Sequence, residues 1–334
     1  MKPNDLKKLI YERFKAGIKR PVLVESSPGF GKTQIASQAA KELGIAFHAI
    51  HAPLLQPEDY GFPVINSKRD DVSFIVSKDK FPVVGSAFPE AGIFLIDELS
   101  QADASAQKVL ANLIQERDIH GQRLMENWLV IATGNKTTDR AGANRILSHL
   151  GNRLTRVALD ISLDDWTNWA LTNGVKPEVI SFIRFRPELL SNFDSQQEVN
   201  ATPRAWVEGV SAALGAIAPE LELEVFKGDV GEGPAAEFLG FLKIFRKLPS
   251  PETIIMKPDT TPVPKDPATQ YAIVGALVSR TESSNFGRVM KYISRLPAEF
   301  SVLYIRDAIA KVPELQNTKE FIQWAAGPGA KLLR

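Results

Sequence analysis

The chain has 334 residues, no cysteine and a formal net charge of +1, and 44% of its residues are hydrophobic. This length is more than one compact domain usually holds, so we expect two domains. The near-neutral charge gives no general attraction to nucleic acid or to a membrane surface. Without cysteine, disulfides, thiolate metal sites and cysteine catalysis are excluded. The amphipathic N-terminal segment and the lack of a long apolar run predict a cytoplasmic protein.

The first half of the chain alternates short apolar runs with helical patterns. Asp5 is expected to cap a helix that places Leu6, Ile10 and Phe14 on one face. Further helices are expected at 33–43, 104–116 and 143–150, and strands at 22–24, 45–51, 93–96, 128–132 and 156–161. Two β-hairpins are expected at 62–76 and 118–124. This alternation predicts an α/β fold with a parallel sheet covered by helices on both faces.

After Ser162 the pattern becomes helical. Ser162 and Asp165 form a capping-box pattern at the start of a helix that Gly174 ends. Further helices are expected at 177–186, 203–216, 235–247, 267–281, 284–296, 298–311 and 318–326, with a proline-rich connector at 247–267. Trp166 and Trp169 are expected in the core, with an aromatic platform for adenine as the alternative. The predicted domains are therefore residues 1–161 and an all-α domain over 162–334.

A glycine-containing loop, SSPGFGKT, follows the first strand. It matches the phosphate-binding pattern G-x-x-x-x-G-K-[ST] at Gly31, Lys32 and Thr33, with Ser26 in place of the first glycine. Glycines allow the backbone N–H groups to surround phosphate oxygens, and the following helix directs its positive end at them. The alternative is a glycine-rich turn with a surface lysine, but the strand–loop–helix context favours a phosphate site.

This loop predicts ATP and Mg²⁺ as cofactors. Lys32 is expected to contact the β- and γ-phosphate oxygens, and the Thr33 hydroxyl to ligate Mg²⁺. The residues expected to bind the nucleotide are Ser27, Pro28, Gly29, Phe30, Gly31, Lys32, Thr33 and Gln34.

Two adjacent carboxylates, Asp97 and Glu98, end the apolar strand at 93–96. The carboxyl edge of a parallel sheet is where ligands of such folds bind. We expect Asp97 to hold Mg²⁺, directly or through water, and Glu98 to act as the general base on the attacking water. By itself such a strand end is often only solvated; its position after the phosphate loop favours the catalytic interpretation.

Asn135 follows the next strand, in the sequence LVIATGN. Its amide could orient the lytic water or contact the γ-phosphate. Equally, it could stabilise the turn after Gly134. The sequence leaves both open.

The order of these elements resembles AAA+ ATPases, and several local stretches resemble the MoxR-type branch, which includes the CbbQ and NorQ activators. The resembling stretches, within residues 1–215, are Leu54–Gly61, Asp97–Ala102 with Gln101 in place of the branch's arginine, Asn152-Arg153-Leu154 and Thr202-Pro203-Arg204-Ala205. The resemblance implies a P-loop AAA+ core over 1–161 and a helical lid over 162–334. It also implies a homo-oligomeric ring, usually a hexamer, with nucleotide between subunits.

The resemblance further implies two arginines at the γ-phosphate. Arg153 matches the arginine finger offered to the neighbouring subunit, with Arg156 and Arg145 as competitors. Arg204 matches the sensor-2 arginine of the lid, which acts in its own subunit. The alternatives are a surface cation for Arg153 and a lid salt bridge for Arg204. The hairpins at 62–76 and 118–124 correspond to insertions that face the ring pore or a partner.

Three functions from different classes fit these observations. The leading one is a ring ATPase that remodels a protein client, for example one carrying a von Willebrand factor A domain. A nucleic-acid motor is the second, and the near-neutral charge disfavours it. The third is a non-hydrolysing, nucleotide-dependent scaffold, which the presence of Lys32, Asp97 and Glu98 disfavours.

Overall fold

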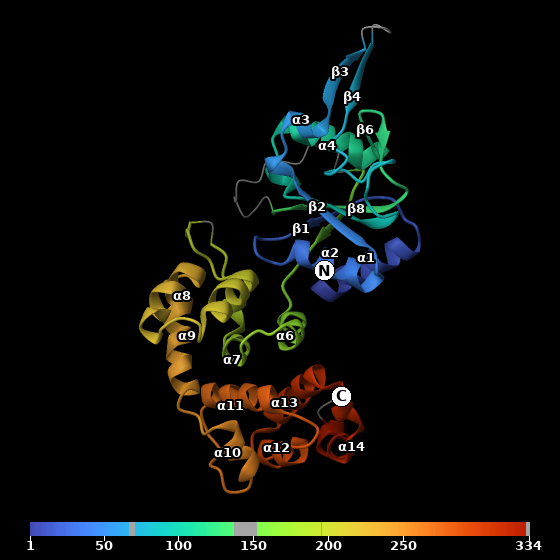
Figure 1. Cartoon of the computed structure of the whole chain (residues 1–334). Coiled ribbons are helices and arrows are strands. Elements are labelled where there is room, and N and C mark those ends of the chain that lie inside the picture. Colours follow the sequence, from blue (N-terminus) through green and yellow to red (C-terminus); the bar gives the residue numbers. More distant parts are fainter. Residues whose placement is uncertain (67–70, 137–151, 195, 332–334) are drawn as a thin grey trace. The chain divides into compact units, whose positions relative to one another are not determined.

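The computed structural model describes residues 1–66, 71–136, 152–194 and 196–331 (Figure 1). The chain forms two compact units. The first, here the sheet unit, is Met1–Ile161 with Asp194–Gln196; the second, the helical unit, is Ser162–Phe193 with Gln197–Arg334. Each unit has its own hydrophobic cores.

The sheet unit is built on five parallel strands in the order β2-β5-β8-β1-β9. Their bounds are β1 (Val22–Glu25), β2 (Ala46–His51), β5 (Ala91–Asp97), β8 (Asn127–Gly134) and β9 (Thr155–Ala158). The flanking helices are α1 (Pro3–Lys15), α2 (Lys32–Leu43) and α4 (Ala104–Glu116). The register pairs Val24 with Thr133 and Ile96 with Ala132, so the ends of β1, β5 and β8 meet at one edge.

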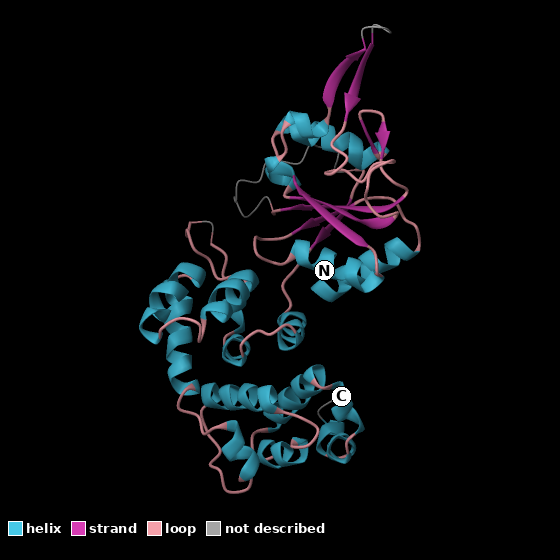
Figure 2. Cartoon of the chain, in the orientation of Figure 1, coloured by secondary structure: helices cyan, strands magenta, loops and turns pink. Residues whose placement is uncertain are grey.

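Helices lie on both faces of the five-stranded sheet (Figure 2). Val22 and Val24 share a core with residues of α1 and α2, whereas Leu23 shares one with residues of α4. Side chains in a strand alternate between the faces of a sheet, and a sheet covered on both faces needs apolar residues at every position. This explains the unbroken apolar runs, and the predicted α/β class with a parallel sheet covered on both faces is confirmed.

Two hairpins extend from the sheet unit, as predicted. They are β3 (Phe62–Asn66) with β4 (Asp71–Ile75), and β6 (Asp118–Ile119) with β7 (Gln122–Arg123), and the short helices η1 (Ala52–Leu54), α3 (Pro57–Tyr60) and η2 (Leu99–Gln101) lie in the same unit. The rings of Phe74 and His120 stack at a centroid distance of 4.5 Å. A Cβ on Gly61 would lie 2.9 Å from the His120 ring, so a glycine permits this contact between the hairpins.

The helical unit consists of helices packed on two cores. The α-helices are α6 (Leu163–Thr172), α7 (Pro177–Phe185), α8 (Glu222–Val230), α9 (Glu232–Phe245), α10 (Pro251–Met256), α11 (Pro267–Arg280), α12 (Phe286–Ile293), α13 (Ala298–Lys311) and α14 (Lys319–Ala326). Shorter turns are η4 (Pro187–Leu190), η6 (Pro219–Leu221), η7 (Pro313–Asn317) and η8 (Pro328–Lys331), and η5 (Ala205–Ser211) is π-helical.

The Ser162 hydroxyl caps α6 by accepting the Asp165 N–H at 3.3 Å. Trp166 is buried in this core, as expected, and Trp169 is partly buried.

Several expected boundaries need correction. Helix α1 begins at Pro3 after Lys2, so Asp5 lies inside the first turn and does not cap it. The last strand ends at Ala158 rather than at residue 161. Helix α8 was not predicted, and the supposed connector at 247–267 contains α10, which Ser250 caps. The helix expected at 143–150 lies outside the described residues.

None of the helices in the described part of the chain combines the length and the apolar character that a membrane span requires.

Candidate nucleotide-binding site

The loop between β1 and α2 is shaped by two glycines in left-handed conformation. Gly29 and Gly31 both have φ of +77°, a backbone conformation that a side chain would strain. Nothing lies within 4 Å of a Cβ built on Gly31. Helix α2 starts directly after it, and no side chain of the described residues caps its N-terminus. Its first N–H groups can therefore bind an anion.

Among the described residues, the Lys32 ammonium contacts four oxygens near this loop. It donates to the Ser26 carbonyl at 3.1 Å, the Ser26 hydroxyl at 3.1 Å, the Ser27 carbonyl at 3.4 Å and Asn135 Oδ1 at 3.1 Å. Ser26, which replaces the first glycine of the pattern, is fully buried, and its N–H donates to the Gly134 carbonyl at 3.3 Å. The serine is thus accommodated and supplies an acceptor to the lysine.

The Asp97 carboxylate accepts hydrogen bonds from two hydroxyls. Thr33 Oγ1 donates to Asp97 Oδ2 at 2.8 Å, and Thr133 Oγ1 donates to Asp97 Oδ1. Thr133 also accepts the Glu98 N–H at 2.9 Å. The phosphate loop, β5 and β8 are therefore joined through one carboxylate, and the two residues predicted to bind Mg²⁺ are in direct contact.

Glu98 has a left-handed backbone with φ of 56° and ψ of 38°. Non-glycine residues in this conformation are uncommon and are often associated with functional sites. Its Oε2 lies 3.2 Å from Nε2 of His51, the last residue of β2, which the register pairs with Asp97. The side chain of Glu98 remains 34% exposed, so water can reach it.

Asn135 is buried, and its N–H donates to the Ser100 hydroxyl at 3.1 Å. Its Oδ1 contacts the Lys32 ammonium, as described above. The side chain is therefore directed toward the phosphate loop, and its contact with a γ-phosphate or with water stays a prediction.

The candidate arginines lie in different environments. Arg156 binds both oxygens of Glu25, with Nη2–Oε1 at 2.6 Å and Nε–Oε2 at 3.1 Å, and this ion pair raises its pKa. The half-exposed Arg153 donates to the Gln115 side chain and lies 3.6 Å from Glu116. Arg204, in the helical unit, precedes the π-helical segment and lies 3.9 Å from Glu208. Arg145 lies outside the described residues.

Three residues of this site were not predicted from the sequence: Thr133, His51 and Ser100. The available signal was position, because Thr133 and His51 lie within one residue of the carboxyl ends of β8 and β2. Polar residues at the carboxyl ends of parallel strands are candidates for the same site as Asp97.

The residues present fit a magnesium-bound triphosphate. In the described part of the chain no cluster of three or more His, Asp or Glu side chains could hold a metal. Mg²⁺, however, usually takes one or two carboxylates and completes its shell with phosphate oxygens and water. The contact between Thr33 and Asp97 provides two hard oxygen ligands at one point, next to the loop and the lysine.

Residues 21–148 match the model of the ATPase family associated with various cellular activities (AAA). With its parallel sheet, phosphate loop and separate helical region, the chain has the AAA+ P-loop fold. The match ends before the helical unit begins. No curated protein matches the sequence.

Solved structures with a similar fold include a Cytophaga hutchinsonii protein named provisionally as an ATPase, at 16% identity and a TM-score of 0.35. The similarity covers 90% of this chain and 79% of that one. Another is the RuvB Holliday junction branch migration motor of Thermotoga maritima, at 17% identity and a TM-score of 0.38, covering 83% of this chain and 80% of RuvB. A single-residue variant of that RuvB is 15% identical with a TM-score of 0.40, and the similarity covers 82% of this chain and 79% of the variant. Similarities this low carry no argument about function.

Proposed function

We propose that this chain is a MoxR-like AAA+ ring ATPase that hydrolyses ATP with Mg²⁺ and uses the energy to remodel or activate a protein partner. The observation that carries the proposal is the hydrogen bond between Thr33 Oγ1 and Asp97 Oδ2 at 2.8 Å. It joins the phosphate loop to the acidic end of β5, which is the arrangement that a triphosphate and its metal need.

Each residue at the edge has a proposed role. The backbone N–H groups between Ser27 and Gln34, Pro28 excepted, and the Lys32 ammonium would bind the phosphates, and Thr33 and Asp97 would hold the metal. When bound, Mg²⁺ would supply positive charge to the phosphate groups held at this edge. Glu98, partly exposed to water, takes the proton of the attacking water. Asn135 positions that water or contacts the γ-phosphate.

Turnover in a ring requires an arginine from a neighbouring subunit, and Arg153 is the best candidate. An arginine that enters another subunit's site must be exposed and weakly held in its own subunit. Arg153 is half-exposed and contacts only side chains of α4 among its described partners, whereas Arg156 forms a bidentate ion pair with Glu25. These contacts favour Arg153 over Arg156. Arg204 is proposed as the sensor of the subunit's own nucleotide.

A protein client is favoured by the surface of the β3–β4 hairpin. Four apolar side chains of this hairpin are more than half exposed, and they are Phe62, Ile65, Val72 and Ile75. Exposed apolar side chains gathered on one element mark sites of protein interaction. The described residues of the hairpin, Phe62–Asn66 and Asp71–Ile75, include no Lys or Arg, whereas a nucleic-acid motor would need cations along such a surface. A von Willebrand factor A domain protein is the proposed class of client, by resemblance to the MoxR branch.

The decisive experiment compares Glu98→Gln with the unchanged protein in phosphate release and in nucleotide binding. The amide keeps the shape of the side chain but cannot take a proton, so hydrolysis should fall at least about 100-fold while ATP with Mg²⁺ still binds. Glu90→Gln, at an exposed residue away from the site, is the matched control.

Unchanged hydrolysis by Glu98→Gln would remove Glu98 as the general base. If the unchanged protein forms a nucleotide-dependent ring by mass photometry yet hydrolyses no ATP, the scaffold function replaces the ATPase. Stimulation of turnover by DNA, and not by protein, would instead favour the nucleic-acid motor.

A further inference from the structure

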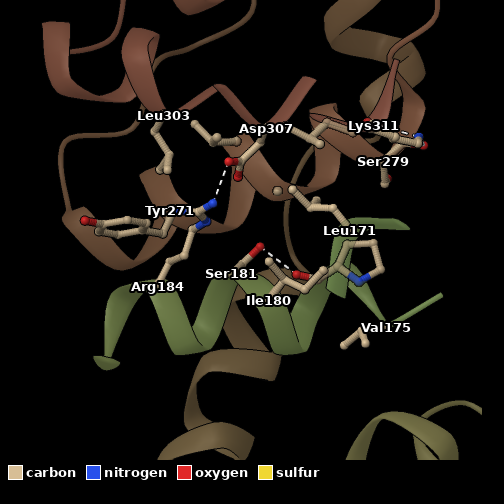
Figure 3. A pocket seen from close by; sticks show the side chains of 14 residues that line it. Leu171, Val175, Ile180, Ser181, Arg184, Tyr271, Ser279, Leu303, Asp307 and Lys311 are labelled. Atoms are coloured by element: carbon tan, nitrogen blue, oxygen red, sulfur yellow. Dashed lines mark hydrogen bonds and ion pairs between the residues drawn. The ribbon is translucent and has the colours of Figure 1, made fainter. Parts of the chain in front are cut away.

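A cavity of about 200 Å³ lies among helices α6, α7, α11 and α13 of the helical unit (Figure 3). Its apolar wall is formed by Leu171, Val175, Ile180, Val274, Val278 and Leu303. An apolar cavity of roughly 150 Å³ is enough to hold benzene, so this one has room for a ligand slightly larger than that.

Loose packing of the helices does not explain this cavity. Gly275 on α11 and Ser181 on α7 both line it, and a Cβ on Gly275 would lie 1.8 Å from Ser181 Oγ. The two helices therefore touch closely at its border. The Ser181 hydroxyl is used within α7, where it donates to the Pro177 carbonyl at 2.7 Å.

A buried ion pair lies in the cavity wall. Figure 3 shows Arg184 extending from α7 toward Asp307 on α13, and Nη2 donates to Asp307 Oδ1 at 2.5 Å. Both side chains are about 95% buried, with exposures of 5% and 4%. Among the described residues, Arg184 Nε has no hydrogen-bond partner. A buried donor without a partner is unfavourable, and well-packed apolar residues are often as stable as a buried ion pair. The stability of the fold therefore does not by itself explain why an arginine occupies position 184.

The charges of the side chains that line the cavity do not cancel. Asp307 offsets Arg184, but Lys311 also lines the cavity, and its ammonium donates to the carbonyls of Val278 at 3.2 Å and Ser279 at 2.5 Å. Burial lowers the Lys311 pKa, while the nearby charges of Glu282 and Arg280 act on it in opposite directions. Two cations and one carboxylate line the wall, which leaves a surplus positive charge.

We propose that this cavity binds a small organic carboxylate with an apolar body about the size of benzoate. The carboxylate accepts a hydrogen bond from the Arg184 guanidinium, which suits this group geometrically, and balances the charge of Lys311. The apolar body packs on the side chains of α6, α7 and α11. The site lies within the helical unit, and the proposal does not depend on ATP hydrolysis.

The test is calorimetric titration of the full chain with four probes: benzoate, benzyl alcohol, benzylamine and inorganic phosphate. Benzoate should bind with a Kd of about 1 mM or tighter, as expected for a ligand of about nine non-hydrogen atoms. The other three probes share either its apolar body or its negative charge, but not both. They should bind at least about 10-fold more weakly, a difference typical of one charge-assisted contact.

Two variants locate the binding. Arg184→Met with Asp307→Leu removes both charges together, so neither is left buried alone, and benzoate affinity should fall about 10-fold or more. Val274→Phe keeps the ion pair but fills the cavity, and should abolish binding of benzoate. Arg288→Met changes an exposed arginine on α12 that does not line the cavity, and should leave binding unchanged.

Each part of the proposal has an outcome that would overturn it. Benzoate affinity that equals that of benzyl alcohol would overturn the preference for an anion. No binding of benzoate, or binding unchanged by Val274→Phe, would overturn the site. If the double variant does not fold, Val274→Phe decides the question, with its folding checked by thermal unfolding.

Discussion

The carboxyl edge of the sheet and the core of the helical unit both contain charged side chains that are at least partly buried. The two regions supply these side chains with hydrogen bonds in different ways. At the edge, Lys32 contacts four oxygens and Asp97 accepts from two hydroxyls. In the helical unit, one short hydrogen bond joins Arg184 to Asp307, which also lies 3.7 Å from Arg306, and Arg184 Nε is left without a partner among the described residues.

The difference follows from the backbone. Parallel strands end at a common edge, where loop carbonyls, amides and hydroxyls gather, so a charge there can exchange one partner for another. Such a network can release Lys32 to a phosphate at small cost. Helices satisfy most of their own backbone groups internally, so a charge between them finds fewer backbone partners, and Arg184 is paired with the side chain of Asp307. In the helical unit, burial accordingly raises the pKa of the Asp307 carboxyl.

The largest expected effect at the sheet edge comes from Lys32→Ala. Charge-assisted hydrogen bonds contribute roughly 1.5–3 kcal/mol each, and Lys32 is proposed to make several to phosphate. ATP affinity should fall at least about 100-fold and hydrolysis to background, as measured by fluorescent-nucleotide titration and phosphate release. Lys41→Ala, at the other end of the same helix, is the control. Tight ATP binding by Lys32→Ala would contradict the proposed phosphate contact.

A second pair of substitutions distinguishes the two described candidates for the arginine finger. Arg153→Ala should keep ATP binding and lose turnover by about 10³-fold, within the range for an arginine finger. Arg156→Ala should instead keep turnover and lower the thermal stability, because it leaves Glu25 unpaired.

Mixing rings provides the control for this comparison. Subunits carrying Arg153→Ala mixed with Lys32→Ala subunits should recover part of the activity if the finger acts between subunits. Lost turnover in Arg156→Ala with rings intact, and none lost in Arg153→Ala, would exchange the two roles. Loss in neither would point to Arg145.

The smallest expected effect is on how the unfolding free energy depends on pH, through Asp307 in the helical unit. Burial raises the pKa of the Asp307 carboxyl from 3.8 to about 6, although Arg184 and Arg306 oppose this. The folded state holds this proton more tightly than the unfolded state does. The carboxyl's contribution to stability is therefore fully present below about pH 4 and is lost as the pH rises through about 6.

Asp307→Asn removes this titration. Between pH 4 and pH 7 the unfolding free energy of the unchanged protein should fall relative to that of the variant, by on the order of 1–3 kcal/mol. Urea unfolding at the two pH values measures it. An identical pH dependence in both proteins would show that burial does not perturb this carboxyl.

The sequence was sufficient for the elements with a strong local signal. The spacing of Gly31, Lys32 and Thr33 and the apolar run before Asp97 predicted a strand–loop–helix beside an acidic strand end, and the α/β class followed. The contact of Thr133 with Asp97 could not be predicted, because the register between parallel strands depends on packing between distant segments. The roles of the predicted site residues stay predictions.

The helical unit was harder to predict for similar reasons. Helix α8 contains Glu222, which is buried and binds Arg246, and nothing local indicates this pairing. Helix α10 had a usable signal, since Ser250 and Pro251 are favourable residues at a helix start. A helix was predicted at 203–216, but no recognisable local pattern marks Ala205–Ser211 as π-helical.

The left-handed backbone of Glu98 has a consequence for engineering the protein. A glutamate in that conformation is strained by roughly 1 kcal/mol or more, and glycine or asparagine would relieve the strain. Selection for heat resistance alone would therefore favour replacing this residue, and the more robust protein would lack its carboxylate. A library aimed at stability should keep position 98 fixed and be screened for activity in parallel.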